Sequence, residues 1–394
     1  MHLLTGLQLV LIGALILVVL QLCLNVRVLR ALATPRRSPV GPLPSVSVLI
    51  PARNESARVA SCLAGWLNQG VSPTELLVLD DESTDDTLMR LHAALAGVPW
   101  ASVLAGASKP SGWSGKSFAC HQLAQAARGD VLVFADADVV PGPDTLEALL
   151  GLFARPETHA VAVLPRHTAS SMIGRHVAPL QTWVLLCFCP LWLNSRRPRA
   201  TLSAANGQLF VVRRRAYDMA GGHRAVAGSL AEDTAFGRRL AACGFETTLV
   251  DGTRLVTCAS YESFPEMWFG HAKNLFAVLF HSRVLATSAV LALVLGWVLP
   301  WCLLVAFMAR GAAAPALPLA EIVLGLTTRV VVSRRFGYSV LNIWSQPLLA
   351  LLLGALIGNS VWAYRRGSVR WRGREYHLAE PTGGSAPLWH RPDG

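Results

Sequence analysis

The stretch VLVFADADVV, residues 131–140, places two acidic residues directly after an apolar run. A short run such as 131–135 is typical of a strand that is buried on both faces of a sheet. Asp136 and Asp138 then follow at its carboxyl end. Taken alone, an Asp-x-Asp pattern is too short to indicate a site, and a polar turn explains it more simply. The surrounding sequence has to decide between these two interpretations.

Apolar runs alternate with helical patterns on the amino-terminal side of this stretch. We expect strands at 45–52, 75–81, 101–106 and 131–138, and helices at 56–68, 85–95 and 117–128. Strands that alternate with helices at this spacing predict a parallel sheet with helices on both faces. The predicted fold class is therefore α/β, with a Rossmann-like, mostly parallel sheet.

Polar residues gather where the predicted strands end. In a parallel sheet ligands bind outside the carboxyl ends of the strands, so segments 51–55, 80–85 and 108–116 are informative together with the acidic pair. The chain has neither a P-loop nor the glycine pattern of a dinucleotide fold. A site built from carboxylates needs a cation to meet a phosphate, and oxygen ligands suit Mg²⁺ or Mn²⁺. We expect Asp138, together with Asp136, to hold that metal.

The amino-terminal segment predicts a membrane helix. The chain has 394 residues, of which 53% are hydrophobic, and residues 3–25 contain no charged side chain. That length is enough to cross a bilayer. Arginines follow at positions 27, 30, 36 and 37, which by the positive-inside tendency places the amino terminus outside and the next domain in the cytoplasm. A cleaved signal peptide is the alternative, although a basic n-region is missing and the apolar stretch is too long.

Three further apolar stretches lie at 285–309, 314–332 and 339–363. The middle stretch contains Glu321 and Arg329, which indicates a broken, re-entrant or interior-facing segment. Three complete crossings would put the arginine-rich tail outside the cell. We therefore expect an even number of crossings in this region, and a multi-pass protein of the cell membrane.

These patterns divide the chain into six regions. They are an N-terminal transmembrane helix (1–25), a basic linker (26–44), the α/β domain (45–262), an amphipathic or interfacial segment (263–283), a C-terminal transmembrane region (284–363) and a basic tail (364–394).

The net charge of +11 comes largely from arginines beside apolar segments. Membrane topology and attraction to anionic lipids explain this charge, so the lipid bilayer is an expected partner and nucleic acid is not. The eight cysteines form no paired C-x-x-C pattern. They indicate neither a zinc site nor a need for disulfides.

The motifs, taken in order, resemble those of a known family. PARNES (51–56), VLDDESTDDT (78–87), GWSGKSFAC (112–120), FADADV (134–139), GQLFVVRRRAYDMAGGH (207–223), AEDTAFGRRL (231–240) and WRGREY (371–376) match in sequence the membrane-bound glycosyltransferases of family 2, which have the GT-A fold. The resemblance covers roughly residues 45–280 and the tail. The chain looks most similar to the branch that glycosylates lipids, such as ceramide, hopanoid-associated and carotenoid glucosyltransferases.

The resemblance implies roles for residues of these motifs. It implies that the donor, a nucleotide-diphosphate sugar and by family habit a UDP-sugar, is bound by Pro51, Arg53, Asn54, Glu55, Asp80, Asp81, Lys116 and Asp136. It further implies that Asp138 ligates the metal, that Asp136 assists near the ribose, and that Glu232 and Asp233 supply the catalytic base. The residues fit an inverting transfer, because a carboxylate can deprotonate the acceptor while a cation and Lys116 neutralise the leaving group.

Simpler explanations exist for several of these residues. Glu232 and Asp233 also suit the start of a helix that ends at Gly244, where the helix dipole favours acids. Lys116 also fits a solvated loop, and residues 207–208 also fit a plain turn. Residues 53–54 also fit a cap of the following helix.

One motif of many relatives, Q/R-x-x-R-W, is missing. The corresponding region, SFPEMWFGHAKNLF (263–276), has Trp268, His271 and Lys273 but no arginine pair. A processive polysaccharide synthase is therefore disfavoured. His271 and Lys273 are candidates to replace the missing contact to the diphosphate, and a surface helix at the membrane explains them equally well.

The segment VAPLQTWVLLCFCPLWL (177–193) is too apolar for an exposed loop. It is either core or an interfacial segment that admits a lipid acceptor. The acceptor-side candidates are Trp183, Gly207, Gln208, Trp268, His271 and Lys273.

The sequence thus predicts transfer of a hexose to a hydroxyl or carboxyl group of a membrane lipid. The alternatives are a polyprenyl-phosphate or polysaccharide sugar transferase, and a non-catalytic membrane assembly or transport subunit.

Overall fold

The computed structural model describes residues 2–34, 43–194, 207–311, 315–371 and 374–377. The predictions for the central part of the basic linker and for the end of the basic tail lie outside these residues. The described residues form two compact units. The α/β unit is drawn from segments 29–168 and 193–259, and the membrane-helix unit from segments 1–28, 169–192 and 260–384.

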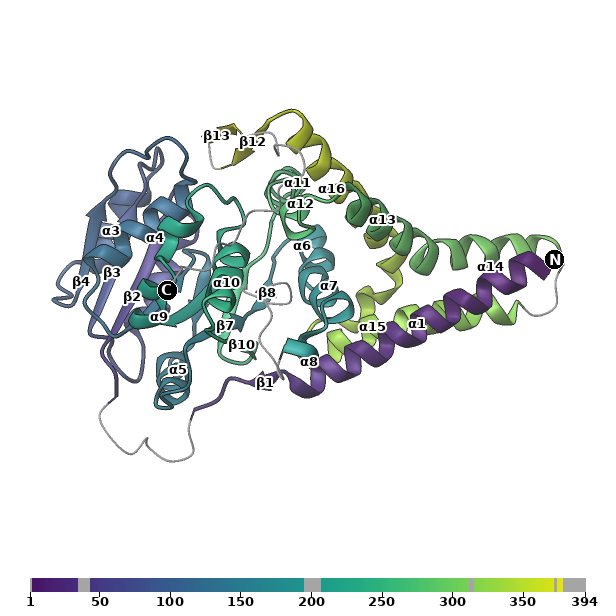
Figure 1. Ribbon diagram of the computed structural model, residues 1–394, viewed down its shortest axis with the longest axis horizontal. Coiled ribbons are helices and arrows are strands. Elements are labelled where there is room, and N and C mark those ends of the chain that lie inside the picture. Colours follow the sequence, from purple (N-terminus) through teal and green to yellow (C-terminus); the bar gives the residue numbers. More distant parts are fainter. Residues whose placement is uncertain (1, 35–42, 195–206, 312–314, 372–373, 378–394) are drawn as a thin grey trace. The chain divides into compact units, whose positions relative to one another are not determined.

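The α/β unit is built on an eight-stranded sheet (Figure 1). Its strands are β1 (Arg30–Ala31), β2 (Val46–Ala52), β3 (Glu75–Asp80), β4 (Ala101–Ala105), β5 (Val131–Ala135), β7 (Ala160–Leu164), β9 (Leu209–Arg213) and β10 (Thr247–Asp251). The order is β1-β10-β7-β9-β5-β2-β3-β4. Only β9 runs antiparallel to its neighbours among these described strands. The prediction of a mostly parallel α/β sheet is confirmed.

Helices cover both faces of this sheet. One face packs against α2 (Val59–Leu67), α3 (Thr87–Leu95) and α5 (Thr145–Phe153). The other packs against α4 (Gly115–Ala126), α9 (Arg214–Met219), the 3₁₀ helix η2 (Gly222–Val226) and α10 (Glu232–Ala242). Side chains alternate along β5, so Val131 and Val133 enter the first layer while Leu132 and Phe134 enter the second. The continuous apolar run of this strand therefore reflects burial on both faces.

The strand that we expect at 131–138 ends earlier, at Ala135. Residues 136–138 form a turn, and the chain then enters β6 (Val139–Pro141). β6 belongs to a second sheet with the order β6-β11-β8, formed with β8 (Arg166–Thr168) and β11 (Val256–Ala259). The acidic pair is thus both a turn and the connection between two sheets.

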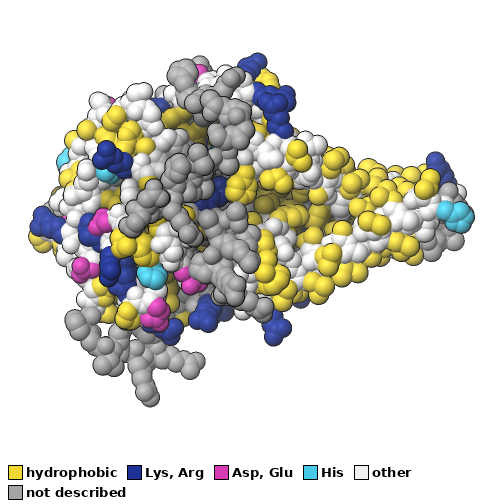
Figure 2. Space-filling model, in the orientation of Figure 1, with side chains coloured by type: hydrophobic (Ala, Val, Ile, Leu, Met, Phe, Trp, Pro, Cys, Tyr) yellow, Lys and Arg dark blue, Asp and Glu magenta, His cyan; other side chains and the backbone are white. Residues whose placement is uncertain are grey.

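The membrane-helix unit contains the long apolar helices. They are α1 (His2–Val28), α13 (Arg283–Trp297), α14 (Leu299–Ala309), α15 (Ala316–Phe336) and α16 (Gln346–Arg365). The shorter elements are α6 (Met172–Val177), α7 (Leu180–Phe188), α8 (Leu191–Asn194), α11 (Phe264–Ala272), α12 (Leu275–Val278), η3 (Val340–Ser345), β12 (Ser368–Trp371) and β13 (Arg374–His377). By length and composition, His2–Val28, Arg283–Ala309, Ala316–Phe336 and Val340–Arg365 could each cross a membrane. Figure 2 shows hydrophobic side chains exposed along these helices.

The middle C-terminal stretch, α15, is one continuous helix and not a broken one. Glu321 and Arg329 are 0% and 1% exposed, so the interior-facing alternative describes this segment. Three C-terminal helices meet the length and composition of a span. The even number of crossings that the arginines favour stays a prediction, and it requires that one of the three does not cross.

Most of the apolar segment at 177–193 belongs to the membrane-helix unit, and many of its side chains are buried. Trp183 and Leu186, on α7, are fully buried. The Trp183 Nε1–H donates to Thr328 Oγ1 of α15 at 2.8 Å. Asn25 of α1 donates from Nδ2 to the Leu186 carbonyl oxygen at 2.7 Å. These hydrogen bonds tie α7 to α1 and to α15.

Candidate active site

A pocket opens at the carboxyl ends of β2 and β5 within the α/β unit. Its walls are Pro51, Lys116, Cys120, Phe134, Ala135, Asp136, Gly207, Phe210, His223, Glu232, Asp233 and Phe236. Five of these residues, Pro51, Lys116, Asp136, Glu232 and Asp233, belong to the predicted donor-binding and catalytic set. The structure therefore brings together residues from four separate sequence motifs, at the edge of the sheet where ligands of parallel sheets bind.

Lys116 links the two acidic motifs. Ser114 caps α4 by accepting a hydrogen bond from the Ser117 N–H at Oγ, and this cap sets Lys116 in the first turn of the helix. The Lys116 Nζ lies 2.7 Å from Asp136 Oδ1 and 2.9 Å from Glu232 Oε1. Burial works to lower the pKa of Lys116, but the carboxylates of Asp136 and Glu232 raise it well above its usual value. Lys116 is therefore a fixed cation of the pocket and not a solvated loop residue.

The turn after β5 orients the two aspartates differently. The Asp136 N–H donates to the Gln208 carbonyl oxygen at 2.9 Å, and the Asp136 carboxylate faces Lys116. The Asp138 Oδ1 accepts from the Cys258 thiol at 3.6 Å. Burial raises the pKa of Asp136 to about 7, Lys116 opposes this rise, and the nearby charge of Asp138 adds to it.

This donor set suits a hard divalent cation. Two carboxylates within one turn can share an Mg²⁺ or Mn²⁺ ion, which usually completes its coordination with water and substrate phosphate oxygens. In the described part of the chain, no three His, Cys, Asp or Glu side chains converge as a ready metal site. Water and the substrate would therefore have to supply the remaining ligands.

Glu232 and Asp233 begin α10 and also enter the pocket. Asp233 accepts hydrogen bonds from the Gly207 N–H at Oδ2 (2.8 Å) and from the Thr234 N–H at Oδ1 (2.6 Å). A Cβ atom at Gly207 would lie 2.7 Å from Asp233 Oδ2, so any larger residue there would displace the Asp233 side chain. Burial raises the pKa of Asp233, and the charge of Glu232 raises it further. Glu232 and Asp233 thus stand at the start of a helix and also line the pocket.

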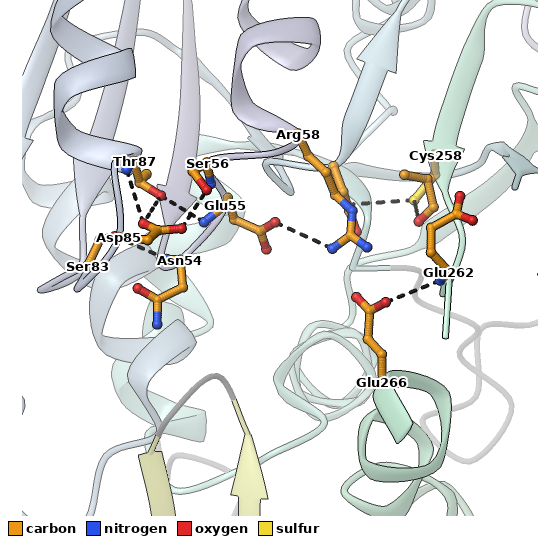
Figure 3. Close-up of polar contacts among 12 residues, drawn as sticks. Asn54, Glu55, Ser56, Arg58, Ser83, Asp85, Thr87, Cys258, Glu262 and Glu266 are labelled. Carbon is orange, nitrogen blue, oxygen red and sulfur yellow. Dashed lines mark hydrogen bonds and ion pairs between the residues drawn. The ribbon is translucent and has the colours of Figure 1, made fainter. Parts of the chain in front are cut away.

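The loops that follow β2 and β3 are tied to one another (Figure 3). Arg53 donates from Nη1 to the carbonyl oxygens of Asp81 and, at 2.8 Å, of Glu82. Asn54 accepts from the Thr84 N–H at Oδ1, at 2.8 Å, and the Glu55 N–H donates to Thr87 Oγ1, also at 2.8 Å. The cap explanation for residues 53–54 is wrong, because α2 begins only at Val59 and its N-cap is Arg58.

Asp80 and Asp81 are both buried where β3 ends. The Ser83 N–H donates to Asp80 Oδ2 at 3.2 Å. The other carboxylate oxygen of Asp80, Oδ1, is buried and accepts no hydrogen bond from the residues that the structure describes. A buried carboxylate oxygen needs a donor, so Asp80 fits a contact with an N–H or O–H group of a ligand.

Gln208 lies beside the metal-binding candidates. Its side chain contacts His167 Nε2 within 3.1 Å and donates from Nε2 to Cys258 Sγ at 3.0 Å. Cys258 in turn contacts Asp138. Gln208, an acceptor-side candidate, is therefore linked through Cys258 to the turn at residues 136–138.

The remaining acceptor-side candidates belong to the membrane-helix unit. Trp268 stacks on Phe264 with ring centroids 5.6 Å apart, and His271 packs edge-on against Tyr261 at 5.1 Å. The Lys273 carbonyl oxygen accepts from the Tyr364 hydroxyl at 2.9 Å. Their roles toward the acceptor or the diphosphate stay predictions.

Sequence reasoning assigned no role to His223, which lines the pocket. His223 falls at the end of the GGH motif, but this pattern alone equally fits a helix stop. Its contact partner Tyr217 lies on a different element, so the sequence carries no local signal of their interaction.

A mostly parallel sheet with a lysine–carboxylate pocket at its strand ends, joined to membrane-length helices, is the arrangement of a membrane-type glycosyltransferase with the GT-A fold. The chain belongs to Glycosyl transferase family 21, whose sequence model matches residues 7–384. The motif resemblance pointed to family 2, whereas the matching model is that of family 21. The prediction of a glycosyltransferase similar to the lipid and carotenoid branch is confirmed.

The similarities of this chain to individual proteins are consistent with this family. The chain is 26% identical over 349 residues to the 4,4'-diaponeurosporenoate glycosyltransferase of Staphylococcus aureus (strain bovine RF122 / ET3-1), covering 85% of this chain and 89% of that protein. It is 28% identical over 236 residues to the enzyme of the same name from Staphylococcus haemolyticus, covering 59% and 61%. The structure of a mannosyltransferase from Pyrobaculum calidifontis in complex with GDP-Man and Mn²⁺ matches with a TM-score of 0.52 at 18% identity, covering 91% of this chain and 97% of that one.

Proposed function

We propose that this enzyme moves a hexose, with inversion, from a nucleotide-diphosphate sugar to a hydroxyl or carboxyl group of a membrane lipid. The observation that carries the proposal is the double ion pair of Lys116 with Asp136 and Glu232. It joins the residues that suit a sugar diphosphate to those that suit acceptor activation, in one pocket of the α/β unit.

The donor would be bound by the loops after β2 and β3 and by the turn at residues 136–138. Asp80, whose buried Oδ1 accepts no hydrogen bond from the described residues, and Asp81 would bind the nucleobase and ribose, and segment 51–55 would close over them. Asp136 and Asp138 would hold Mg²⁺ or Mn²⁺, which neutralises charge on the leaving diphosphate. Lys116 contributes a second positive charge for the same purpose. UDP is the expected nucleotide by family habit.

The acceptor side depends on the chemistry of the acceptor. A hydroxyl acceptor gives its proton to Asp233 as its oxygen bonds to the anomeric carbon and the bond from that carbon to the diphosphate breaks. A carboxylate acceptor is already ionised near neutral pH, so it can form the same bond without losing a proton. The staphylococcal relatives are named for an acceptor of the carboxylate kind, a diaponeurosporenoate.

The proposed location is the cell membrane, with the α/β unit in the cytoplasm. The apolar helices and the arginines that follow α1 support it. The bilayer would then supply the lipid acceptor directly.

Mass spectrometry of lipids from cells that express the chain tests this function. We expect a new lipid heavier by one hexose, absent from cells that express Asp138→Ala. The purified Asp138→Ala variant should also lose metal-dependent binding of the nucleotide sugar. A hexose on polyprenyl phosphate or on a polymer would point to the alternative transferases. Unchanged lipids together with metal-independent behaviour would favour a non-catalytic subunit.

A further inference from the structure

His223 has a buried imidazole in the pocket. The proposed mechanism assigns this imidazole no role. It is 6% exposed and lines the pocket. Its ring stacks on Phe236 at 5.4 Å and meets the edge of Phe134 at 4.8 Å. Aromatic contacts on both sides fix the plane of the ring, so its nitrogen atoms point in defined directions.

Tyr217 determines which ring nitrogen carries the proton. The His223 backbone N–H donates to Tyr217 Oη at 3.1 Å, and Tyr217 Oη lies 2.9 Å from His223 Nδ1. Among the described residues, Nδ1 is the acceptor within reach of the buried Tyr217 hydroxyl hydrogen. The hydroxyl therefore donates to Nδ1, and the neutral ring must carry its proton on Nε2.

The glycine pair before His223 makes this arrangement possible. Gly221 and Gly222 have φ values of +81° and +53°, a backbone region that other residues rarely adopt. A Cβ atom at Gly222 would lie 2.6 Å from the Tyr217 ring. The close approach of this loop to Tyr217 thus needs glycine. Because Nδ1 is the ring nitrogen that faces Tyr217, Nε2 lies on the other side of the ring.

The imidazole stays neutral in this environment. Burial lowers the pKa of His223 to about 3, although the charge of Glu232 acts in the opposite direction and that of Lys116 lowers it further. The Nε2–H is therefore a neutral hydrogen-bond donor across the physiological pH range. It belongs to the same pocket as Glu232 and Asp233, and a carboxylate in its ionised form can only accept hydrogen bonds.

A neutral donor beside carboxylates suits one kind of ligand group. A diphosphate is better met by Lys116 and a metal ion, because these carry positive charge. A sugar hydroxyl, in contrast, both accepts and donates, so it can bridge an N–H donor and a carboxylate.

We propose that His223 Nε2–H donates to one hydroxyl oxygen of the donor hexose and that this contact selects which hexose is transferred. The same hydroxyl donates to Glu232 or Asp233. Tyr217 acts as a positioning residue, because it fixes the tautomer without touching the sugar. This inference rests on the proposed function and deepens it by assigning the sugar subsite.

The test measures kcat/KM for the natural nucleotide sugar and for a set of analogues, each lacking one ring hydroxyl. We expect the native enzyme to discriminate against one analogue by about 10- to 100-fold more than against the others, since a site built for a hydroxyl rejects a ligand that lacks it. His223→Phe should reduce this discrimination to about one while leaving the other ratios unchanged. His223→Gln retains an N–H donor and should keep part of it.

Two further variants distinguish an effect on the choice of the sugar from a general effect on the folding of the enzyme. Tyr217→Phe removes only the hydroxyl, and we expect a weaker loss of discrimination at the same sugar position. His121→Gln changes a histidine of α4 that does not line the pocket, and it should behave as the native enzyme. An equal fall of kcat/KM for all donors in His223→Phe overturns the inference. If the native enzyme turns over no nucleotide sugar, the proposed function itself fails.

Discussion

Asp233 has structural contacts and, in the proposed mechanism, a chemical role as well. Its carboxylate accepts two backbone N–H groups, and the buried environment raises its pKa, which suits a general base. The proposed mechanism needs this base for a hydroxyl acceptor and not for a carboxylate acceptor. The same residue can therefore report which acceptor chemistry the enzyme uses.

For Asp233→Asn, we predict that transfer to a lipid alcohol falls by about 10²-fold or more, the usual contribution of a general base. Transfer to a lipid carboxylate should fall by less than about tenfold, because no proton has to be removed. The measurement is kcat with matched alcohol and carboxylate acceptors in detergent. Donor affinity, measured by calorimetry, serves as the control and should stay within about threefold.

An equal loss for both acceptors would mean that Asp233 acts by holding Gly207 and the pocket together. In that case Asp233 would not be the base.

At the scale of the elements, the loops after β2 and β3 act as one body. Asn54 and Glu82 both have left-handed backbone, with φ of 52° and 53°, a strained conformation that is tolerated where the surroundings enforce it. Asp85 contributes to this enforcement (Figure 3), since its carboxylate accepts from the N–H groups of Ser56 at 3.2 Å and Thr87 at 3.0 Å. The two loops, which are the proposed donor-binding loops, are thus held together by hydrogen bonds of their own.

We predict that Asp85→Ala raises the KM for the nucleotide sugar by about three- to tenfold at pH 7 and leaves kcat nearly unchanged, because a loosened loop must be ordered on binding. Asp86→Ala is the matched control, as Asp86 is an exposed neighbour whose side chain makes no cap hydrogen bond. Steady-state kinetics on both variants distinguishes them. A similar KM for the two variants would contradict the role of Asp85.

The same carboxylate predicts a pH dependence. Burial works to raise the pKa of Asp85, but hydrogen bonds from Thr87 and Ser56 lower it to about 2. A lowered pKa means that the ionised form stabilises the fold above the ordinary aspartate pKa near 4, and that this contribution is lost as the pH falls toward 2. Because Asp85 is exposed, we expect the effect to be small and reduced by salt.

At the scale of the whole molecule, the prediction concerns the side of the membrane on which each part lies. The arginines after α1 predict an outside amino terminus and a cytoplasmic α/β unit. Cysteines introduced at His2, at Asp86 and at Gly394 can be probed with a maleimide that does not cross membranes. We expect labelling at position 2 in intact cells, and labelling at positions 86 and 394 only after permeabilisation.

The unaltered chain, with its eight native cysteines, gives the background for this labelling. Position 86 labelled in intact cells would reverse the proposed topology. Position 394 labelled in intact cells would show three C-terminal crossings and would contradict the even number that we predict.

Several features could be predicted because their signals are local. The strand at β2, the helix at α3 and the apolar helices follow from runs and periods within a few residues of one another. The predicted ends of helices and strands differ from the observed ends where a specific contact determines the end. α4 begins at Gly115 because Ser114 caps it, and β5 ends at Ala135 because Asp136 turns to meet Gln208.

The sequence by itself determined the class of this protein: an alternating α/β chain with acids at its strand ends and apolar helices on either side, since side-chain periodicity and residue chemistry record burial directly. Only the tertiary structure decided that Lys116 pairs with Glu232, that the Tyr217 hydroxyl contacts His223 Nδ1, and that Trp183 donates to Thr328. Each of these contacts joins different elements. They depend on which helix packs on which face, and no pattern within a single segment encodes that choice.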